Sequence, residues 1–156
     1  MADIYDVHPP TARWTHVALR VSDIEASIAW YIEHTPLRLI DKRSDEMGHG
    51  AWLGHDDTPD SPFVLVLAEF FEETDPFSGT AKATLAPFAH LGIELTSRAA
   101  VDESADIARD LGFLAMEPRD LGPPIGYICM VTDPDGNMIE FSYDQGVYAT
   151  AQSRMR

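Results

Sequence analysis

The amino-acid sequence predicts an α+β fold built from two successive βαβββ modules. Stretches that alternate between apolar and polar side chains indicate strands, and apolar residues three or four positions apart indicate helices. The order of one strand, one helix and three strands occurs twice along the 156 residues. With 45% hydrophobic and 24% charged residues, the composition is typical of a globular chain the size of one compact domain.

The first module is expected at residues 13–70, after an irregular N-terminal arm at residues 1–12. Residues 13–21 alternate and contain β-branched side chains, which predicts a strand. Ser22 can begin the capping of the helix that follows, and helical spacing of apolar residues places that helix at 24–34. Three further strands complete the module, at residues 37–43, 50–53 and 63–70.

The second module is expected at residues 88–144, between a polar linker at 71–87 and a C-terminal tail at 145–156. Residues 88–95 alternate as a strand, and residues 101–111 have the spacing of an amphipathic helix. The linker is long for a compact domain, and long loops often carry function. Three strands again complete the module, at residues 113–118, 127–132 and 137–143.

Two histidines and a glutamate occupy comparable positions in the predicted strands. His16 and His90 each lie opposite the aliphatic face of their strand, and Glu140 alternates with the apolar residues Ile139 and Phe141. A lone histidine in a strand is normally satisfied by a hydrogen bond, which is the simpler interpretation. The repeat favours a ligand role, and a buried carboxylate is costly unless it is paired or bound to a metal. Two imidazoles and a carboxylate suit Fe(II), Zn(II), Mn(II), Ni(II) or Co(II) better than Ca(II).

The repeat also predicts which residue of the first module corresponds to Glu140. The two histidines are 74 positions apart, whereas the turn motifs at 59–61 and 134–136 are 75 apart. With the shift set by the turns, Leu65 is the expected counterpart of Glu140.

Charge and cysteine content exclude several classes of protein. The formal net charge is −15, from 26 acidic and 11 basic residues, so the surface repels nucleic acid and anionic lipid. The single cysteine, Cys129, excludes an internal disulfide and a cysteine-rich zinc site. No run of 18 apolar residues or apolar signal core is present, so we expect no membrane span and a cytoplasmic location.

Three segments carry a resemblance to a known family. They are Thr15-His16-Val17-Ala18-Leu19-Arg20-Val21-Ser22-Asp23, Ala89-His90-Leu91-Gly92-Ile93-Glu94-Leu95 and Thr132-Asp133-Pro134-Asp135-Gly136-Asn137-Met138-Ile139-Glu140-Phe141. The chain resembles the vicinal oxygen chelate superfamily, which includes glyoxalase I, extradiol dioxygenases, methylmalonyl-CoA epimerase, and fosfomycin and bleomycin resistance proteins. The resemblance implies paired βαβββ modules that form an open, cup-shaped mixed sheet around one divalent metal. It also implies that His16, His90 and Glu140 hold this metal, which chelates two neighbouring oxygens of a small substrate.

The resemblance leaves the reaction open. Glyoxalase I has a glutamate, and the epimerase a glutamine, at the family position that falls on Leu65, so this residue argues against both. Three protein ligands resemble the extradiol dioxygenases more closely, although Met130 stands where those enzymes have a tyrosine. We expect an Fe(II) ring-cleaving dioxygenase first and a glyoxalase-like lyase or isomerase second. The alternative is a metal-free protein that sequesters a drug, as bleomycin resistance proteins do, but such a protein has no need of all three ligands.

Other side chains are candidates for chemistry around the metal. The catalytic candidates are Tyr127, His49 and Glu69, and the substrate-binding candidates are Arg20, Glu94, Leu65, Trp52 and Ser142. Arg20 lies two residues from His16 on the same face and can meet an anionic group or form a salt bridge with Glu94. The expected partners are a small molecule with adjacent oxygens and a second copy of the chain. Whether His16 and His90 meet within one chain or across two remains open.

Overall fold

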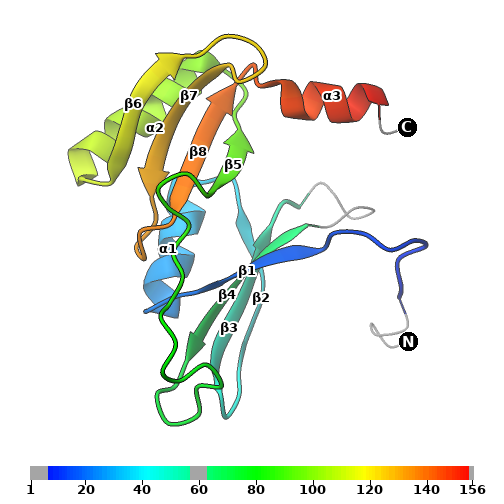
Figure 1. Ribbon diagram of the computed structural model, residues 1–156, viewed down its shortest axis with the longest axis vertical. Coiled ribbons are helices and arrows are strands. Elements are labelled where there is room, and N and C mark those ends of the chain that lie inside the picture. Colours follow the sequence, from blue (N-terminus) through cyan, green and yellow to red (C-terminus); the bar gives the residue numbers. More distant parts are fainter. Residues whose placement is uncertain (1–6, 57–62, 155–156) are drawn as a thin grey trace. The chain divides into compact units, whose positions relative to one another are not determined.

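The computed structural model describes residues 7–56 and 63–154, which form two four-stranded mixed sheets and three helices (Figure 1). This architecture confirms the predicted α+β fold of paired modules. The contacts divide the chain into two units: Met1–Ile24 with Pro36–Ser78, and Glu25–Thr35 with Gly79–Arg156. No helix in the described part of the chain is both long and apolar enough to cross a membrane.

The first unit contains one sheet in the order β1-β4-β3-β2. Its strands are β1 (His16–Arg20), β2 (Arg38–Ser44), β3 (Gly48–Gly54) and β4 (Val64–Phe70). β1 runs parallel to β4, and the other neighbours are antiparallel. Leu19, Leu53 and Leu67 are buried on one face, as the alternation predicts. The turn motif at residues 59–61 lies outside the described residues.

Strand register fixes which side chains of this sheet share a face, because directly paired residues point to the same side. His16 pairs with Val64, and Arg20 pairs with Ala68, which in turn pairs with Gly50. We call this side the open face of the first sheet. Its members include His16, Ala18, Arg20, Arg38, Asp41, Arg43, Gly50, Trp52, Val64, Val66, Ala68 and Phe70.

The second unit contains a sheet of the same topology, β5-β8-β7-β6. Its strands are β5 (His90–Glu94), β6 (Leu114–Asp120), β7 (Tyr127–Thr132) and β8 (Met138–Tyr143). Helix α2 (Arg98–Leu111) packs against β6, β7 and β8. We call the side opposite Ile139 and Phe141 the open face of the second sheet; it carries His90, Gly92, Glu94, Met130, Glu140 and Ser142.

Helix α2 begins three residues earlier than its apolar spacing predicts. The Ser97 side chain accepts a hydrogen bond from the backbone N–H of Ala100, which caps the first turn. At the other end Gly112 adopts a left-handed φ of 83°, and its N–H bonds to the carbonyls of Ala108 and Arg109.

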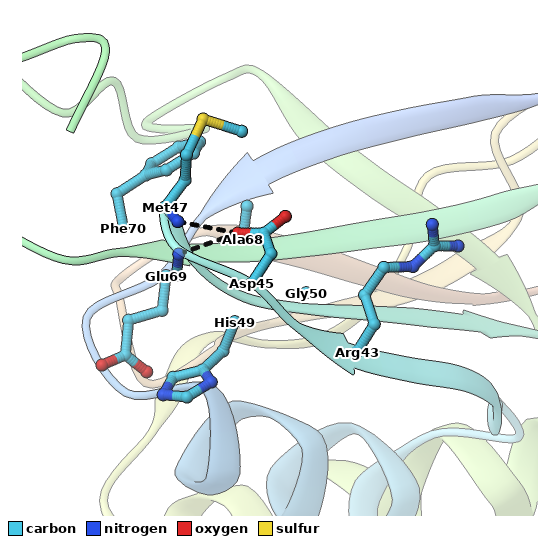
Figure 2. A pocket seen from close by; sticks show the side chains of 9 residues that line it. Arg43, Asp45, Met47, His49, Gly50, Ala68, Glu69 and Phe70 are labelled. Atoms are coloured by element: carbon cyan, nitrogen blue, oxygen red, sulfur yellow. Dashed lines mark hydrogen bonds between the residues drawn. The ribbon is translucent and has the colours of Figure 1, made fainter. Parts of the chain in front are cut away.

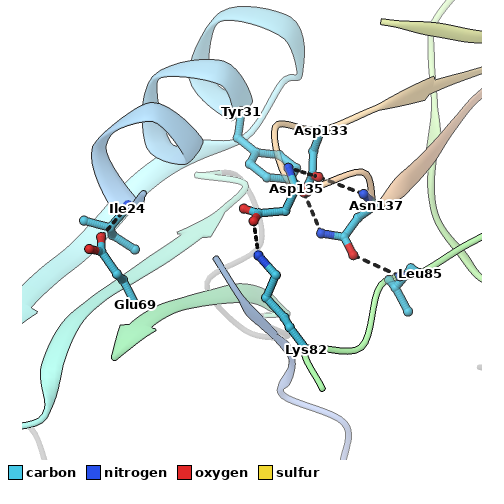
Figure 3. A network of polar contacts seen from close by, with 8 residues as sticks. All are labelled: Ile24, Tyr31, Glu69, Lys82, Leu85, Asp133, Asp135 and Asn137. Carbon is cyan, nitrogen blue, oxygen red and sulfur yellow. Dashed lines mark hydrogen bonds and ion pairs between the residues drawn. The ribbon is translucent and has the colours of Figure 1, made fainter. Parts of the chain in front are cut away.

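Helix α1 (Ile24–His34) has the predicted bounds, and from Glu25 onward it groups with the second unit. The buried Tyr31 hydroxyl donates a 2.7 Å hydrogen bond to Oδ2 of Asp133 in the β7–β8 turn (Figure 3). On the same helix, the Trp30 ring packs edge-on against Phe113 at 5.5 Å between centroids. The helix that the sequence places in the first module is therefore anchored to the turn of the second.

The β7–β8 turn is held by side chains of its own sequence motif. Asp133 Oδ1 accepts from the backbone N–H groups of Asp135 (2.9 Å) and Asn137 (2.8 Å), and the Asn137 amide donates to Asp133 Oδ2 at 2.9 Å. Asn137 Oδ1 accepts from the Leu85 N–H at 2.9 Å, and Lys82 forms an ion pair with Asp135. This network satisfies a buried carboxylate and fixes the start of β8.

The C-terminal segment contains a helix that the sequence did not indicate. Helix α3 spans Gly146–Arg154, within the region predicted as a tail, and none of its nine residues is buried. Because the helix lacks an apolar stripe, periodicity gives no signal for it.

We expect Tyr31→Phe to lower the free energy of unfolding at pH 7 by about 1–3 kcal/mol, because the buried Asp133 loses a donor. Urea unfolding measures this change. Tyr148→Phe is the matched control, since Tyr148 is 67% exposed on α3 and should leave stability unchanged. Equal destabilisation by the two variants would contradict the role given to Tyr31.

The free energy of unfolding at alkaline pH provides a second test of the contact between Tyr31 and Asp133. Burial and the neighbouring Asp133 raise the pKa of Tyr31 well above its usual value, so the folded state favours the neutral phenol. The stabilisation is complete below about pH 10, where the unfolded tyrosine is also neutral, and declines at higher pH. The stability difference between wild type and Tyr31→Phe should therefore narrow above pH 10.

Candidate metal centre

His90 and Glu140 face each other on the open face of the second sheet. β5 and β8 are parallel, and Gly92 pairs directly with Glu140. His90 Nε2 lies 3.6 Å from Glu140 Oε2, and the Glu140 side chain is only 8% exposed. Ligand atoms about 2.0–2.2 Å from a common cation lie roughly 3–3.5 Å apart, so the pair is close to ligand spacing.

The other nitrogen of the His90 ring is fixed by the backbone. Nδ1 lies 2.5 Å from the Phe88 carbonyl oxygen, which can only accept, so Nδ1 carries the proton. In the neutral imidazole the Nε2 lone pair then points toward the Glu140 carboxylate. Two acceptors placed this way need a proton or a cation between them, and metal-binding histidines are commonly oriented by such a carbonyl.

Gln145 orients the glutamate. Its Nε2 donates to Glu140 Oε1 at 2.7 Å, and its backbone N–H donates to Glu94 Oε1 at 3.1 Å. The Ser142 hydroxyl lies 3.5 Å from Gln145 Oε1, so both substrate-binding candidates of this sheet contact Gln145. The sequence analysis missed Gln145, because it follows the last strand and belongs to no periodic pattern.

His16 lies on the open face of the first sheet and is exposed. Thr15 Oγ1 is 2.9 Å from its Nδ1, so here too the partner of the ring is on Nδ1 and Nε2 is available. Both histidines thus have a partner on Nδ1, which at His16 is a hydroxyl that can donate or accept and at His90 a carbonyl that only accepts.

Strand register corrects the expected counterpart of Glu140. Ala18 pairs with Val66 in the first sheet as Gly92 pairs with Glu140 in the second, so the strands keep the 74-residue shift of the histidines. Leu65 instead pairs with Val17 on the opposite face and is 6% exposed, which makes it a core residue. Val66, which is also apolar, is therefore the counterpart of Glu140 in the first sheet.

The structure does not bring Tyr127 to the open face of the second sheet. Tyr127 pairs with Tyr143, three residues along the strand from the Met130–Glu140 pair, and therefore points to the other side. Its hydroxyl donates to Asp102 of α2, which raises its pKa, and the Arg98 guanidinium lies 3.8 Å from its ring centroid. These contacts give Tyr127 a structural position rather than access to Glu140.

His49 and Glu69 pair with each other on the face of the first sheet opposite His16. Figure 2 shows their side chains together beside a pocket of about 150 Å³ at the end of the β2–β3 hairpin. Glu69 Oε2 accepts a 2.7 Å hydrogen bond from the N–H of Ile24, the first residue of α1 (Figure 3). Ser44 Oγ lies 2.7 Å from His49 Nδ1. Glu69 thus caps a helix, and neither residue shares a face with His16.

Arg20 and Trp52, in contrast, lie on the same face as His16. Arg20 forms an ion pair with Asp75, and its guanidinium carbon lies 5.5 Å from the Phe70 ring centroid. Trp52 is 41% exposed. The alternative partner of Arg20, Glu94, instead accepts the backbone hydrogen bond of Gln145.

Within residues 7–56 and 63–154, no group of three or more histidine, cysteine, aspartate or glutamate side chains is close enough to hold a metal ion. The His90–Glu140 pair belongs to the second unit, and His16 belongs to the first.

Two mixed sheets of the same strand order, each with a histidine at the start of its parallel edge strand, define a class of paired-module proteins. The chain belongs to the glyoxalase/bleomycin resistance protein/dioxygenase superfamily, whose family model matches residues 13–141. An uncharacterized protein of Pseudomonas aeruginosa is 35% identical over 131 residues, which cover 84% of this chain and 88% of that protein.

Solved structures of this superfamily share the fold. The trypanothione-dependent glyoxalase I of Leishmania major is similar with a TM-score of 0.64 and 23% identity, over 93% of this chain and 96% of that one. An antibiotic binding protein of Streptomyces, TnmS3, is similar with a TM-score of 0.59 and 22% identity, over 87% and 98%. Both an enzyme and a binding protein are therefore built on this fold.

Replacing Gln145 with alanine removes the donor that holds Glu140 Oε1, so we expect divalent-metal affinity to fall about 10–100-fold. Titration of metal-free protein with Zn(II) in a calorimeter measures this loss. Gln152→Ala, on the exposed α3, is the control and should bind as the wild type does. An unchanged affinity in Gln145→Ala would remove this residue from the metal centre.

Proposed function

We propose that this chain is a divalent-metal-dependent enzyme that chelates a small substrate through two adjacent oxygens. His90, Glu140 and His16 are the proposed ligands. The observation that carries the proposal is the His90–Glu140 pair: Nε2 and Oε2 are 3.6 Å apart, while Nδ1 is bound to a backbone carbonyl. His16 joins the set because of the repeat and because its Nδ1 has a hydroxyl partner.

The donor set fits a first-row divalent ion. Two imidazoles and one carboxylate suit Fe(II), Zn(II), Mn(II), Co(II) or Ni(II) and leave coordination positions open. When bound, such an ion supplies Lewis acidity that stabilises negative charge on substrate oxygens. The chain itself orients the ligands, through the Phe88 carbonyl at His90 and the Gln145 amide at Glu140.

Gly92 leaves room beside these ligands. It pairs with Glu140 and lies on the same face as His90, and a Cβ built on it would meet no atom within 4 Å. A substrate can therefore approach the carboxylate and imidazole without displacing a side chain from this position. A larger residue here would occupy the space that chelation requires.

Two reactions are compatible with this centre. An Fe(II) ring-cleaving dioxygenase is the first to test, because Val66 leaves three protein ligands and no fourth. A lyase or isomerase with a redox-silent metal is the second. In both cases the general base is to be sought on the open faces, since Tyr127, His49 and Glu69 point to other sides. The expected homodimer stays a prediction, which sedimentation velocity tests.

We expect the protein purified without oxygen to retain about one divalent ion per chain, by the ligand chemistry of the set. His90→Ala, Glu140→Ala and His16→Ala should each lose it, as elemental analysis by mass spectrometry would measure. His49→Ala is the matched control, because His49 faces away from His16 and should retain the metal.

The identity of the metal decides the next assay. Iron would direct the work to oxygen uptake with catechols, and zinc, nickel, cobalt or manganese to lyase and isomerase substrates. A wild type that holds no metal and takes none up on reconstitution would overturn the proposal. The similarity to an antibiotic binding protein would then direct the search to a sequestered ligand.

A further inference from the structure

Arg43 lies on the open face of the first sheet and was not among the candidates from the sequence. It pairs with Gly50, which pairs with Ala68, which pairs with Arg20. Arginine therefore stands at both ends of one row across the sheet, with only small residues between. A Cβ built on Gly50 would lie 3.8 Å from Arg43 Cγ, so the stem of Arg43 extends over the glycine.

The guanidinium of Arg43 lies over an aromatic ring. Its Cζ lies 4.8 Å from the Trp52 ring centroid, and its Nη2 donates to Asp41 Oδ2 at 2.9 Å. Stacking on a ring orients the planar fork of donors that arginine offers to a carboxylate or phosphate. Asp41 and Arg43 are both about half exposed, so this ion pair is weak and a substrate anion can compete with it.

Arg20 is less suited to an incoming anion. Its partner Asp75 is only 12% exposed, and the guanidinium carbon also lies 5.5 Å from the Phe70 ring and 5.8 Å from the Phe77 ring. These contacts use Arg20 to hold residues 75–77 against the sheet. Of the two arginines in this row, Arg43 is therefore the one whose charge is more available.

The separation of Trp52 from His16 sets the length of a substrate that could reach both residues. Trp52 is two strands away from His16 and two residues along, at about 4.8 Å per strand and 3.3 Å per residue, which gives about 12 Å between their Cα atoms. An anion beside Arg43 is thus too far from His16 to belong to the chelated oxygens themselves. An anionic group of the same substrate that reached Arg43 would lie at the other end of the molecule.

We propose that Arg43 and Trp52 form a subsite for an anionic group at the far end of an elongated substrate whose other end carries the two chelated oxygens. The subsite rests on the proposed metal-chelating function. The subsite specifies a class of substrate: a molecule with adjacent oxygens at one end and a carboxylate, phosphate or sulfate at the other. The spacer between the two ends must be long enough to reach from the metal ligands to Arg43.

Three chelating probes test the subsite by titration calorimetry of metal-loaded protein. 3,4-Dihydroxycinnamate carries its carboxylate on a two-carbon spacer, 3,4-dihydroxybenzoate carries it directly on the ring, and 4-methylcatechol has none. We expect the cinnamate to bind at least tenfold more tightly than 4-methylcatechol, and the benzoate to gain less than threefold.

Variants then locate the effect. Arg43→Gln should reduce the affinity for the cinnamate to that for 4-methylcatechol and leave 4-methylcatechol unchanged. Trp52→Leu should cause part of the same loss. Arg109→Gln is the charge-matched control, because Arg109 pairs with Glu117 and Asp106 in the second unit and should have no effect.

The outcomes distinguish failure of the proposed subsite from failure of the proposed metal chelation. Equal affinities for the three probes in the wild type, or a preference that persists in Arg43→Gln, would overturn the subsite and leave metal chelation standing. If none of the probes binds the metal-loaded protein, the chelation proposal fails and the subsite fails with it.

Discussion

Alternation of side chains along paired strands is the constraint on which the chemistry of both units depends. A one-residue slip moves a side chain to the other face of a sheet, so register decides which groups can meet. In the second unit the parallel pairing of β5 with β8 places Glu140 beside Gly92 and within 3.6 Å of His90. The same pairing in the first unit places Val66 at the matching position. One copy of the repeat therefore supplies a carboxylate, and the other supplies an apolar surface.

The turn motif that the family shares has a structural role in this chain. Asp133 is 4% exposed, and a buried carboxylate without donors would be strongly destabilising. Backbone N–H groups, the Asn137 amide and the Tyr31 hydroxyl together supply the donors. Since Asn137 directly precedes β8, the network also sets where that strand begins and hence where Glu140 lies. The motif supports the candidate centre by position, without contributing an atom to it.

Much of this could be predicted from the sequence, because the signals are periodic. The α+β class, the order of strands and helices, and the shared side of His90 and Glu140 all follow from a two-residue or 3.6-residue period. The 75-residue separation of the turn motifs predicts Leu65 as the counterpart of Glu140, whereas the strands keep a 74-residue shift, which gives Val66. Tyr127 faces α2 because of its pairing with Tyr143, and pairing across a hairpin is not visible in one strand alone.

The sequence did not indicate Gln145 or Arg43, because no alternating or helical pattern of apolar residues shows where their side chains point. Gln145 lies between β8 and a helix with no apolar stripe, yet it contacts Glu140 and Glu94. Arg43 belongs to an edge strand whose seven residues are all exposed, so no apolar alternation indicates the side to which it points. Only the register with β3 assigns it to the same face as His16. Polar side chains at the ends and edges of elements thus need the three-dimensional structure.

The two open faces have diverged in charge as well as in ligand content. The 74-residue shift that relates the histidines relates Arg20 to Glu94 and Val66 to Glu140, so an arginine and a valine of the first face correspond to two carboxylates of the second. Carboxylates suit a cation, and arginines stacked on aromatic rings suit an anion. A chain with a net charge of −15 repels anions over most of its surface, so an exposed arginine such as Arg43 would offer an anionic substrate a favoured place to bind. The repeat thus provides one framework with two chemistries: the second face carries the proposed ligands His90 and Glu140, and the first face carries Arg43 and Trp52, the groups proposed to bind an anion.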